Sequence, residues 1–446
     1  MKRLFVLCDG TWESALFQSA EHSLTNIARL ANAILPEDRR TKPPTPQLKL
    51  YLPGLGTGEE LVVGAVKGAY GDGLLENVRL AYYFLAQNWL PGDEICLFGF
   101  SRGAYTVRLL SSLLGLVGVL CPRSNLHLFP KVVAALCSRR DGATAKARRN
   151  ALELNQLLER IGANRNRRTE PRFLVSALCI FDTVPLLHHF ECSPFGTDNQ
   201  HLEPDTCKLV LQALSAYEDR PAYRPLILQQ DPKGVARGQI LRQVWFPGCH
   251  TDIGGGYSQH DLSDLTLHWF VGQLSDSVAF DLDYVSEISG DPNAPWGKAT
   301  AHVGVHVLQS PHTRVLPVEP SRHLFPTFES LHPSLLKQSP TSWPKPLQGF
   351  LPRLTASYQT RTLLGGWWQL GAWEQEIKKE WRKRPLPAHL ASDESVLDLI
   401  TAREVVTHVG SARSAPACGG GIRRWLAYEQ AKINGAGNSW QLAHAR

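Results

Sequence analysis

Residues that could form a hydrolase active site stand at the ends of apolar runs in this chain. Ser101 is the centre of Gly99-Phe100-Ser101-Arg102-Gly103, a G-x-S-x-G sequence between a strand-like run and a helical pattern. There the glycines permit the strained turn that exposes a serine hydroxyl, and the backbone N–H of Arg102 points to where an oxyanion would form. The motif predicts a serine nucleophile. The alternative is an ordinary serine in a glycine-flanked turn.

A serine nucleophile needs a histidine base, and that imidazole needs a carboxylate to orient it. Asp182 ends a later apolar run and His250 ends the next, which gives the order serine, acid, histidine typical of α/β-hydrolases. Asp182 could instead cap a helix, and His250 could be a turn histidine. Asp252 competes as the acid, unless it caps the turn before Gly254-Gly255-Gly256. We predict the triad Ser101, His250 and Asp182.

The second donor of an oxyanion hole is expected in the loop after the first strand. Asp9-Gly10-Thr11 occupies that place, so the backbone N–H of Gly10 or Thr11 would serve beside that of Arg102. A plain turn is the alternative.

The sequence contains no recognisable motif for binding a nucleotide or a zinc ion. The glycines between positions 54 and 73 are not followed by G-K-[ST], and no C-x-x-C is matched by a paired histidine motif. We therefore expect no cofactor and no metal. A formal charge of +6 over 446 residues is too small for a dedicated nucleic-acid binder but suits contact with an anionic membrane.

The elements that must position these residues alternate between strand and helix patterns. Apolar runs predict strands at 4–8, 48–52, 94–100, 172–181 and 239–246, and helical spacing appears at 23–35, 74–89 and 103–116. Such alternation predicts an α/β fold, a mostly parallel sheet with helices on both faces, whose functional residues gather at the carboxyl ends of the strands.

The domain organisation follows from shifts in composition. Residues 1–290 are expected to form the α/β-hydrolase domain, with a basic helical insertion at about 125–170. The Pro- and Trp-rich region 291–446 is expected to form a cap or a membrane-docking segment. In its 367–384 stretch tryptophans alternate with lysines and arginines, which suits a membrane interface or, alternatively, a helix packed on the core with a solvated basic face.

The cysteines and the N-terminal residues indicate the cellular compartment in which the protein is made. Nine cysteines, several of them inside apolar runs, predict reduced thiols, not disulfides. The N-terminal apolar run ends at Asp9 without a cleavage site, so no signal peptide is expected. No run of about 18 uncharged apolar residues occurs. We expect synthesis in the cytoplasm and any export by a route that needs no N-terminal signal.

Five segments together resemble a long-uncharacterised α/β-hydrolase family of bacteria and fungi that includes phospholipase effectors of the type VI secretion system. They contain Asp9-Gly10-Thr11-Trp12, Leu52-Pro53-Gly54-Leu55-Gly56, Gly99-Phe100-Ser101-Arg102-Gly103, Phe181-Asp182-Thr183-Val184 and His250-Thr251-Asp252-Ile253-Gly254. The resemblance extends to about Trp269. Where the family commonly has a histidine and then an Asp-Glu-Arg run, in a segment interpreted as a helix, this chain has Gln212 and then Glu218-Asp219-Arg220.

The resemblance implies hydrolysis of phospholipid acyl esters, with Ser101, Asp182 and His250 in the triad positions. It further implies an antibacterial effector with phospholipase A-type activity, exported by type VI secretion into a target cell, with a secretion spike protein and an immunity protein as partners. A soluble intracellular esterase and a non-catalytic scaffold with a vestigial triad are the alternatives.

Overall fold

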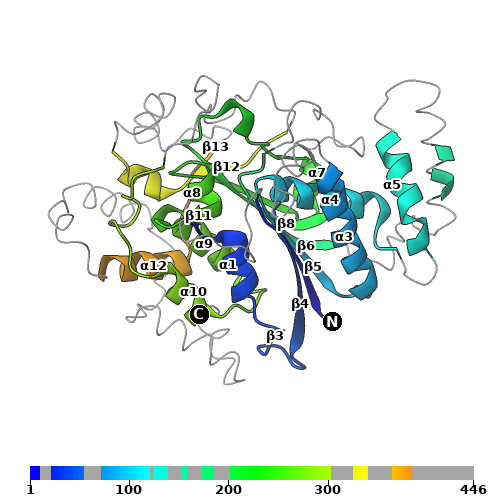
Figure 1. Cartoon of the computed structure of the whole chain (residues 1–446), viewed down its shortest axis with the longest axis horizontal. Coiled ribbons are helices and arrows are strands. Elements are labelled where there is room, and N and C mark those ends of the chain that lie inside the picture. Colours follow the sequence, from blue (N-terminus) through cyan, green and yellow to red (C-terminus); the bar gives the residue numbers. More distant parts are fainter. Residues whose placement is uncertain are drawn as a thin grey trace.

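A nine-stranded sheet is the centre of the computed structural model (Figure 1), in the order β13-β12-β10-β8-β6-β5-β1-β4-β3. Every neighbouring pair is parallel except β3 and β4, so the predicted mostly parallel sheet is confirmed. Its strands are β1 (Arg3–Cys8), β3 (Glu37–Asp38), β4 (Thr45–Leu52), β5 (Glu94–Phe100), β6 (Val175–Phe181), β8 (Cys207–Ser215), β10 (Ile240–Phe246), β12 (Glu329–Leu331) and β13 (Leu364–Trp367).

The structure describes residues 1–10, 22–54, 72–120, 125–138, 152–153, 155–157, 173–184, 201–302, 325–339 and 364–383. Two small pairs flank the main sheet: β2 (His22–Thr25) with β11 (Gly255–Tyr257), and β7 (His201–Leu202) with β9 (Gln229–Gln230). Within the described ranges no helix is long and apolar enough to cross a membrane.

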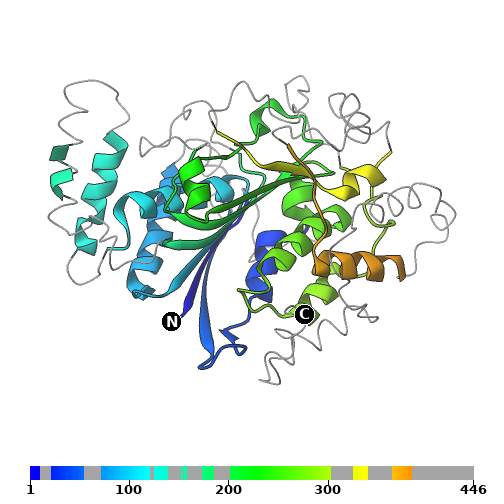
Figure 2. The ribbon, with the colours of Figure 1, turned by 180° about the vertical axis from the view of Figure 1, so that it is seen from behind.

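Helices cover both faces of the sheet because alternate residues of its strands point in opposite directions. Leu4 and Val6 of β1 join the core beneath α3 (Asp72–Asn88), α4 (Arg102–Val117) and α5 (Phe129–Ser138). Phe5 and Leu7 join the core beneath α1 (Asn26–Ala33), α9 (Asp261–Leu274), α10 (Leu282–Ser289) and α12 (Ala372–Lys383). The views from front and back show the two helix layers on either side of the strands (Figures 1 and 2). Strands buried on both faces read as continuous apolar runs, which is why the sequence revealed them.

The segment before Glu218 was wrongly interpreted as helical. Residues 207–215 form β8, which lies between β6 and β10, and Gln212 is fully buried in it. Its amide nitrogen donates to the carbonyl of Leu226 at 3.1 Å, while its amide oxygen has no hydrogen-bond partner among the described residues. A central strand with one polar residue and apolar neighbours on both faces has no clear period, so the sequence pattern was ambiguous.

Parts of the C-terminal region complete the same core. β12 and β13 extend the main sheet, and α12 packs against α9. Trp373 and Trp381 of α12 are buried, and the indole of Trp381 donates to the carbonyl of Ala294 at 2.9 Å. This helix is therefore packed on the core, as the second interpretation of the 367–384 stretch expected. Arg384, like most of the 125–170 insertion, lies outside the described residues, and the boundary at 290 stays a prediction.

Candidate active site

Ser101 occupies a strained turn between β5 and α4. Its backbone dihedrals are φ 56° and ψ −122°, a conformation that costs a non-glycine residue energy and is characteristic of functional turns. The helix can begin so close to the sheet because position 103 is glycine: a Cβ there would lie 2.2 Å from the carbonyl oxygen of Cys8. The backbone N–H of Ser101 donates to the carbonyl of Phe181 at 3.0 Å, which anchors the turn on the end of β6.

Asp182 and His250 meet at the same edge of the sheet. Asp182 follows β6, and His250 is the first residue of α8 (His250–Gly254), just after β10. Nδ1 of His250 lies 2.6 Å from Oδ2 of Asp182, and both side chains are buried. The other carboxylate oxygen of Asp182 accepts the backbone N–H of Ser215 at 3.0 Å. The structure thus brings the predicted acid and the predicted base into contact.

The second ring nitrogen of His250, Nε2, is the one that Asp182 does not contact. An N–H at Nδ1 bonded to Asp182 leaves Nε2 as the acceptor. Nε2 is buried and has no hydrogen-bond partner among the described residues. The imidazole packs against the ring of Phe100, the residue before Ser101, with 4.8 Å between centroids. The imidazole of His250 therefore lies beside the strained turn.

Asp252, the alternative acid, contacts a different histidine. Its Oδ1 lies 2.6 Å from Nδ1 of His302, and its Oδ2 accepts the backbone N–H groups of Cys249 and His302 at 2.9 and 3.0 Å. The hydrogen bond to Asp252 raises the pKa of His302 above its usual value. Asp252 thus caps α8 and fixes residue 302 to it. His302 escaped the sequence analysis because nothing near it in the sequence marks a partner 50 residues away.

Gly10, one of the oxyanion candidates after β1, lies beside a buried carboxyl group. The carboxylate of Asp9 accepts the N–H of Gly10 at 2.7 Å and the hydroxyls of Thr25 and Tyr51 at 2.8 and 2.7 Å. Burial raises the pKa of Asp9 to about 6 despite these three donors. Thr11 lies outside the described residues, and Arg102 begins α4. The oxyanion assignment stays a prediction, with the N–H of Gly10 bonded to Asp9.

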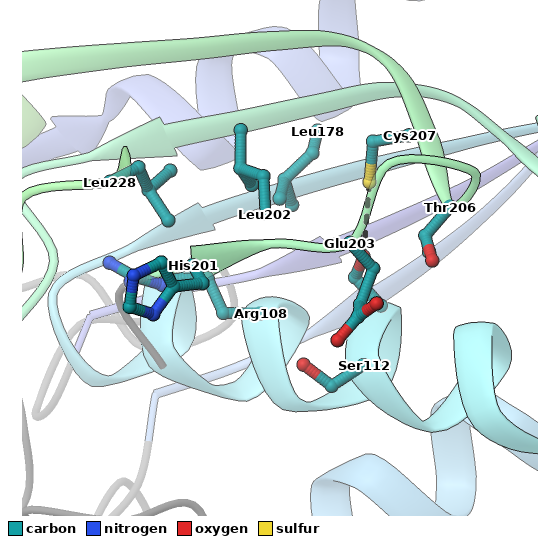
Figure 3. Close-up of a pocket in the computed structure, with 10 residues that line it drawn as sticks. Arg108, Ser112, Leu178, His201, Leu202, Glu203, Thr206, Cys207 and Leu228 are labelled. Atoms are coloured by element: carbon teal, nitrogen blue, oxygen red, sulfur yellow. Dashed lines mark hydrogen bonds between the residues drawn. The ribbon is translucent and has the colours of Figure 1, made fainter. Parts of the chain in front are cut away.

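A separate cleft lies between α4 and the chain around β7 and β8 (Figure 3). Arg108, Ser112, His201 and Glu203 line it, and Ser101, Asp182 and His250 do not. In the described part of the chain, no three His, Cys, Asp or Glu side chains are grouped as metal ligands would be.

Comparison with known proteins places most of the described sheet in one family. Residues 2–273 match the family model described as "T6SS, Phospholipase effector Tle1-like, catalytic domain". "Uncharacterized protein YEL023C" of Saccharomyces cerevisiae is 30% identical over 132 residues, which are 27% of this chain and 18% of that protein.

Two solved structures are also similar. An uncharacterized protein from Pseudomonas aeruginosa has 16% identity and a TM-score of 0.36, with 65% of this chain and 48% of that chain covered. The Tle1 effector bound to the VgrG spike from the type 6 secretion system has 20% identity and a TM-score of 0.29, with coverages of 58% and 51%. The chain spans about half of each solved relative and less than a fifth of the yeast protein.

Proposed function

The chain belongs to the Tle1-like catalytic domain family of type VI secretion phospholipase effectors, and on that basis we propose that it hydrolyses an acyl ester of phospholipid through Ser101, His250 and Asp182. The observation that carries the assignment is the 2.6 Å contact between Nδ1 of His250 and Asp182, at the sheet edge where Ser101 occupies its strained turn. Phospholipase A-type cleavage follows from an attack on a carboxylic ester.

The proposed reaction has two steps, formation of an acyl-enzyme and its hydrolysis, and the same three side chains act in both. Oγ of Ser101 attacks the acyl carbonyl while Nε2 of His250 takes its proton, and His250 returns the proton to the departing alcohol. Water then attacks the acyl-enzyme by the same route and releases the fatty acid. Asp182 keeps the imidazole in one tautomer, and the N–H of Arg102 with that of Gly10 or Thr11 holds the oxyanion. Gly10 would have to exchange its bond to Asp9 for the oxyanion, which favours Thr11.

The partners belong to the same proposal. A solved Tle1 effector is bound to a VgrG spike, and we propose that this chain is likewise exported by type VI secretion on a spike protein and neutralised by an immunity protein in the producing cell. The phospholipid bilayer of a target cell would be its substrate, met by peripheral contact.

The test compares the wild-type protein with Ser101→Ala on phospholipid vesicles and on a short nitrophenyl ester. We expect the variant to keep its thermal unfolding temperature and to lose at least about three orders of magnitude in rate, because only oxyanion and binding contributions survive. Labelling of the wild type by a fluorophosphonate should disappear as well. Activity on the short ester alone would indicate an esterase, and a wild type that neither labels nor hydrolyses would indicate a scaffold.

A further inference from the structure

The turn that follows β8 contacts both members of the acid–base pair. β8 lies between β6 and β10 in the sheet, so its exit passes between Asp182 and His250. The N–H of Ser215 donates to Asp182 at 3.0 Å, and the carboxylate of Glu218 accepts the backbone N–H of His250 at 3.1 Å. The hydroxyl of Ser215 accepts the N–H of Glu218 at 3.1 Å, which ties the two contacts together.

Glu218 is held by a two-point ion pair. Its side chain is 0% exposed, and its two oxygens accept Nε and Nη2 of Arg220 at 2.7 and 2.8 Å. Burial alone would raise the pKa of Glu218, but Arg220 outweighs burial and lowers it. Glu218 is therefore a buried carboxylate that keeps its charge next to His250.

Arg220 also reaches His250 through an aromatic ring. Its guanidinium lies 3.6 Å from the centre of the Tyr223 ring, a stacking distance. The Tyr223 ring meets the imidazole of His250 edge-on, with centroids 4.9 Å apart and planes at 75°. Since Phe100 packs against the same imidazole, the ring of His250 is confined by two aromatic neighbours and by Asp182.

We propose that Glu218, Arg220 and Tyr223 form a bracket that positions His250 and balances the charge it gains in the reaction, an inference that rests on the proposed function. Glu218 stabilises the imidazolium that forms when Ser101 gives up its proton. Arg220 offsets the negative charge of Glu218 before the reaction. Glu218 and Arg220 thus acquire a role in the proposed reaction that their sequence position did not suggest. These are positioning residues because they act through His250.

Among the described residues, the charged and titratable groups near His250 come from four elements. They are Asp182 after β6, Glu218, Arg220 and Tyr223 after β8, Cys249 and Asp252 around α8, and Arg102 of α4 beside Tyr223. Of these, Glu218 and Arg220 can be changed without touching the contact between Asp182 and His250.

The experiment measures the pH profile of kcat/KM on a short nitrophenyl ester for full-length Glu218→Gln and Arg220→Gln. Glutamine at 218 still accepts the N–H of His250 but leaves the positive charge of Arg220 without a counter-charge. The acid limb of the profile, where kcat/KM falls as the pH is lowered, should therefore move to lower pH. Glutamine at 220 leaves the negative charge of Glu218 without a counter-charge, so the acid limb should move to higher pH. We expect opposite shifts of about half a pH unit or more, and a fall in kcat of about tenfold with KM within about twofold. Arg220→Lys should recover the position of the limb but not all of kcat, because lysine lacks the planar two-point contact.

Asp219→Asn is the matched control, since it removes one negative charge from the same turn and should leave the limb in place. Limbs that stay in place, or that move together in both variants, would overturn the bracket while the wild type and Ser101→Ala still behave as the proposed function requires. If a variant unfolds early, the pH dependence of fluorophosphonate labelling below its unfolding temperature gives the same comparison. A wild type that hydrolyses no ester would instead overturn the proposed function.

Discussion

The five-residue helix α8 contributes one residue to each of two histidine–carboxylate pairs. His250 at its first position contacts Asp182, and Asp252 at its third position contacts His302. Both distances are 2.6 Å, so distance alone does not separate them. What separates them is position: of the two histidines, His250 packs against Phe100, the residue before Ser101.

We therefore expect Asp182→Asn to lower kcat by about 10⁴, because the amide favours the wrong imidazole tautomer. Asp252→Asn should lower kcat by less than about tenfold, and it should lower stability through the weakened cap of α8 and the weakened contact with His302. Steady-state kinetics and thermal unfolding of both variants check this ranking. If the order of the kcat losses is reversed at equal stability, the acid is Asp252.

Asp9 should make stability depend on pH between about 4 and 6. Its pKa is raised from 3.8 to about 6, so the folded protein holds a proton that the unfolded chain has already lost in this range. The free energy of unfolding, relative to that of Asp9→Asn, should be greatest below pH 3.8 and fall as pH rises to 6. The total change should reach about 3 kcal/mol at most. Urea unfolding of both proteins at pH 3.5, 5 and 7.5 measures the difference, and a flat difference would contradict the prediction.

At the scale of elements, strands could be predicted from the sequence where an apolar run alone marked them. The strands that end at Cys8, Phe100, Phe181 and Phe246 are apolar runs that stop at a polar turn, and each was predicted within a few residues of its observed bounds. Sequence analysis failed at β8, whose buried Gln212 interrupts the pattern. It also missed the contacts of Glu218 and Tyr223 with His250, because they depend on β8 lying between β6 and β10, which no local pattern encodes.

The α12 helix shows the same limit, since its tryptophans and lysines fit either a membrane or a core. Trp373 is 2% exposed and packs with Trp269 and Phe270 in one core cluster. We expect Trp373→Ala to destabilise the protein by about 3–5 kcal/mol. Lys379→Gln, which breaks a surface ion pair with Glu376, should change stability by about 0.5 kcal/mol or less. The denaturant midpoints of the two variants measure these changes. If both variants change stability by the same small amount, α12 is again a candidate for membrane docking.

At the scale of the whole molecule, the described C-terminal segments belong to the catalytic sheet. The indole of Trp245 in β10 donates to Glu329 of β12 at 2.8 Å, and His332 stacks on Phe246 with centroids 4.4 Å apart. These contacts cover the strand that leads to His250.

A chain that ends at residue 290 should therefore be insoluble or molten, although the sequence predicted a domain boundary there. It would expose the edge of β10 that pairs with β12 and the face of α9 that α12 covers. Size-exclusion chromatography and near-UV circular dichroism of the truncated and full chains make the comparison. A monomeric, active 1–290 fragment would show that the predicted boundary is real.

The order in which the proposed triad residues occur along the chain also has a consequence in time. His250 is synthesised about 150 residues after Ser101. At roughly 5–20 residues per second, the proposed nucleophile emerges before the proposed base by on the order of ten seconds. β12 and β13, which complete the sheet beside His250, emerge later still. On the proposed function, the growing chain would be inactive until His250 and the strands beside it have been synthesised, which delays any hydrolysis inside the producing cell.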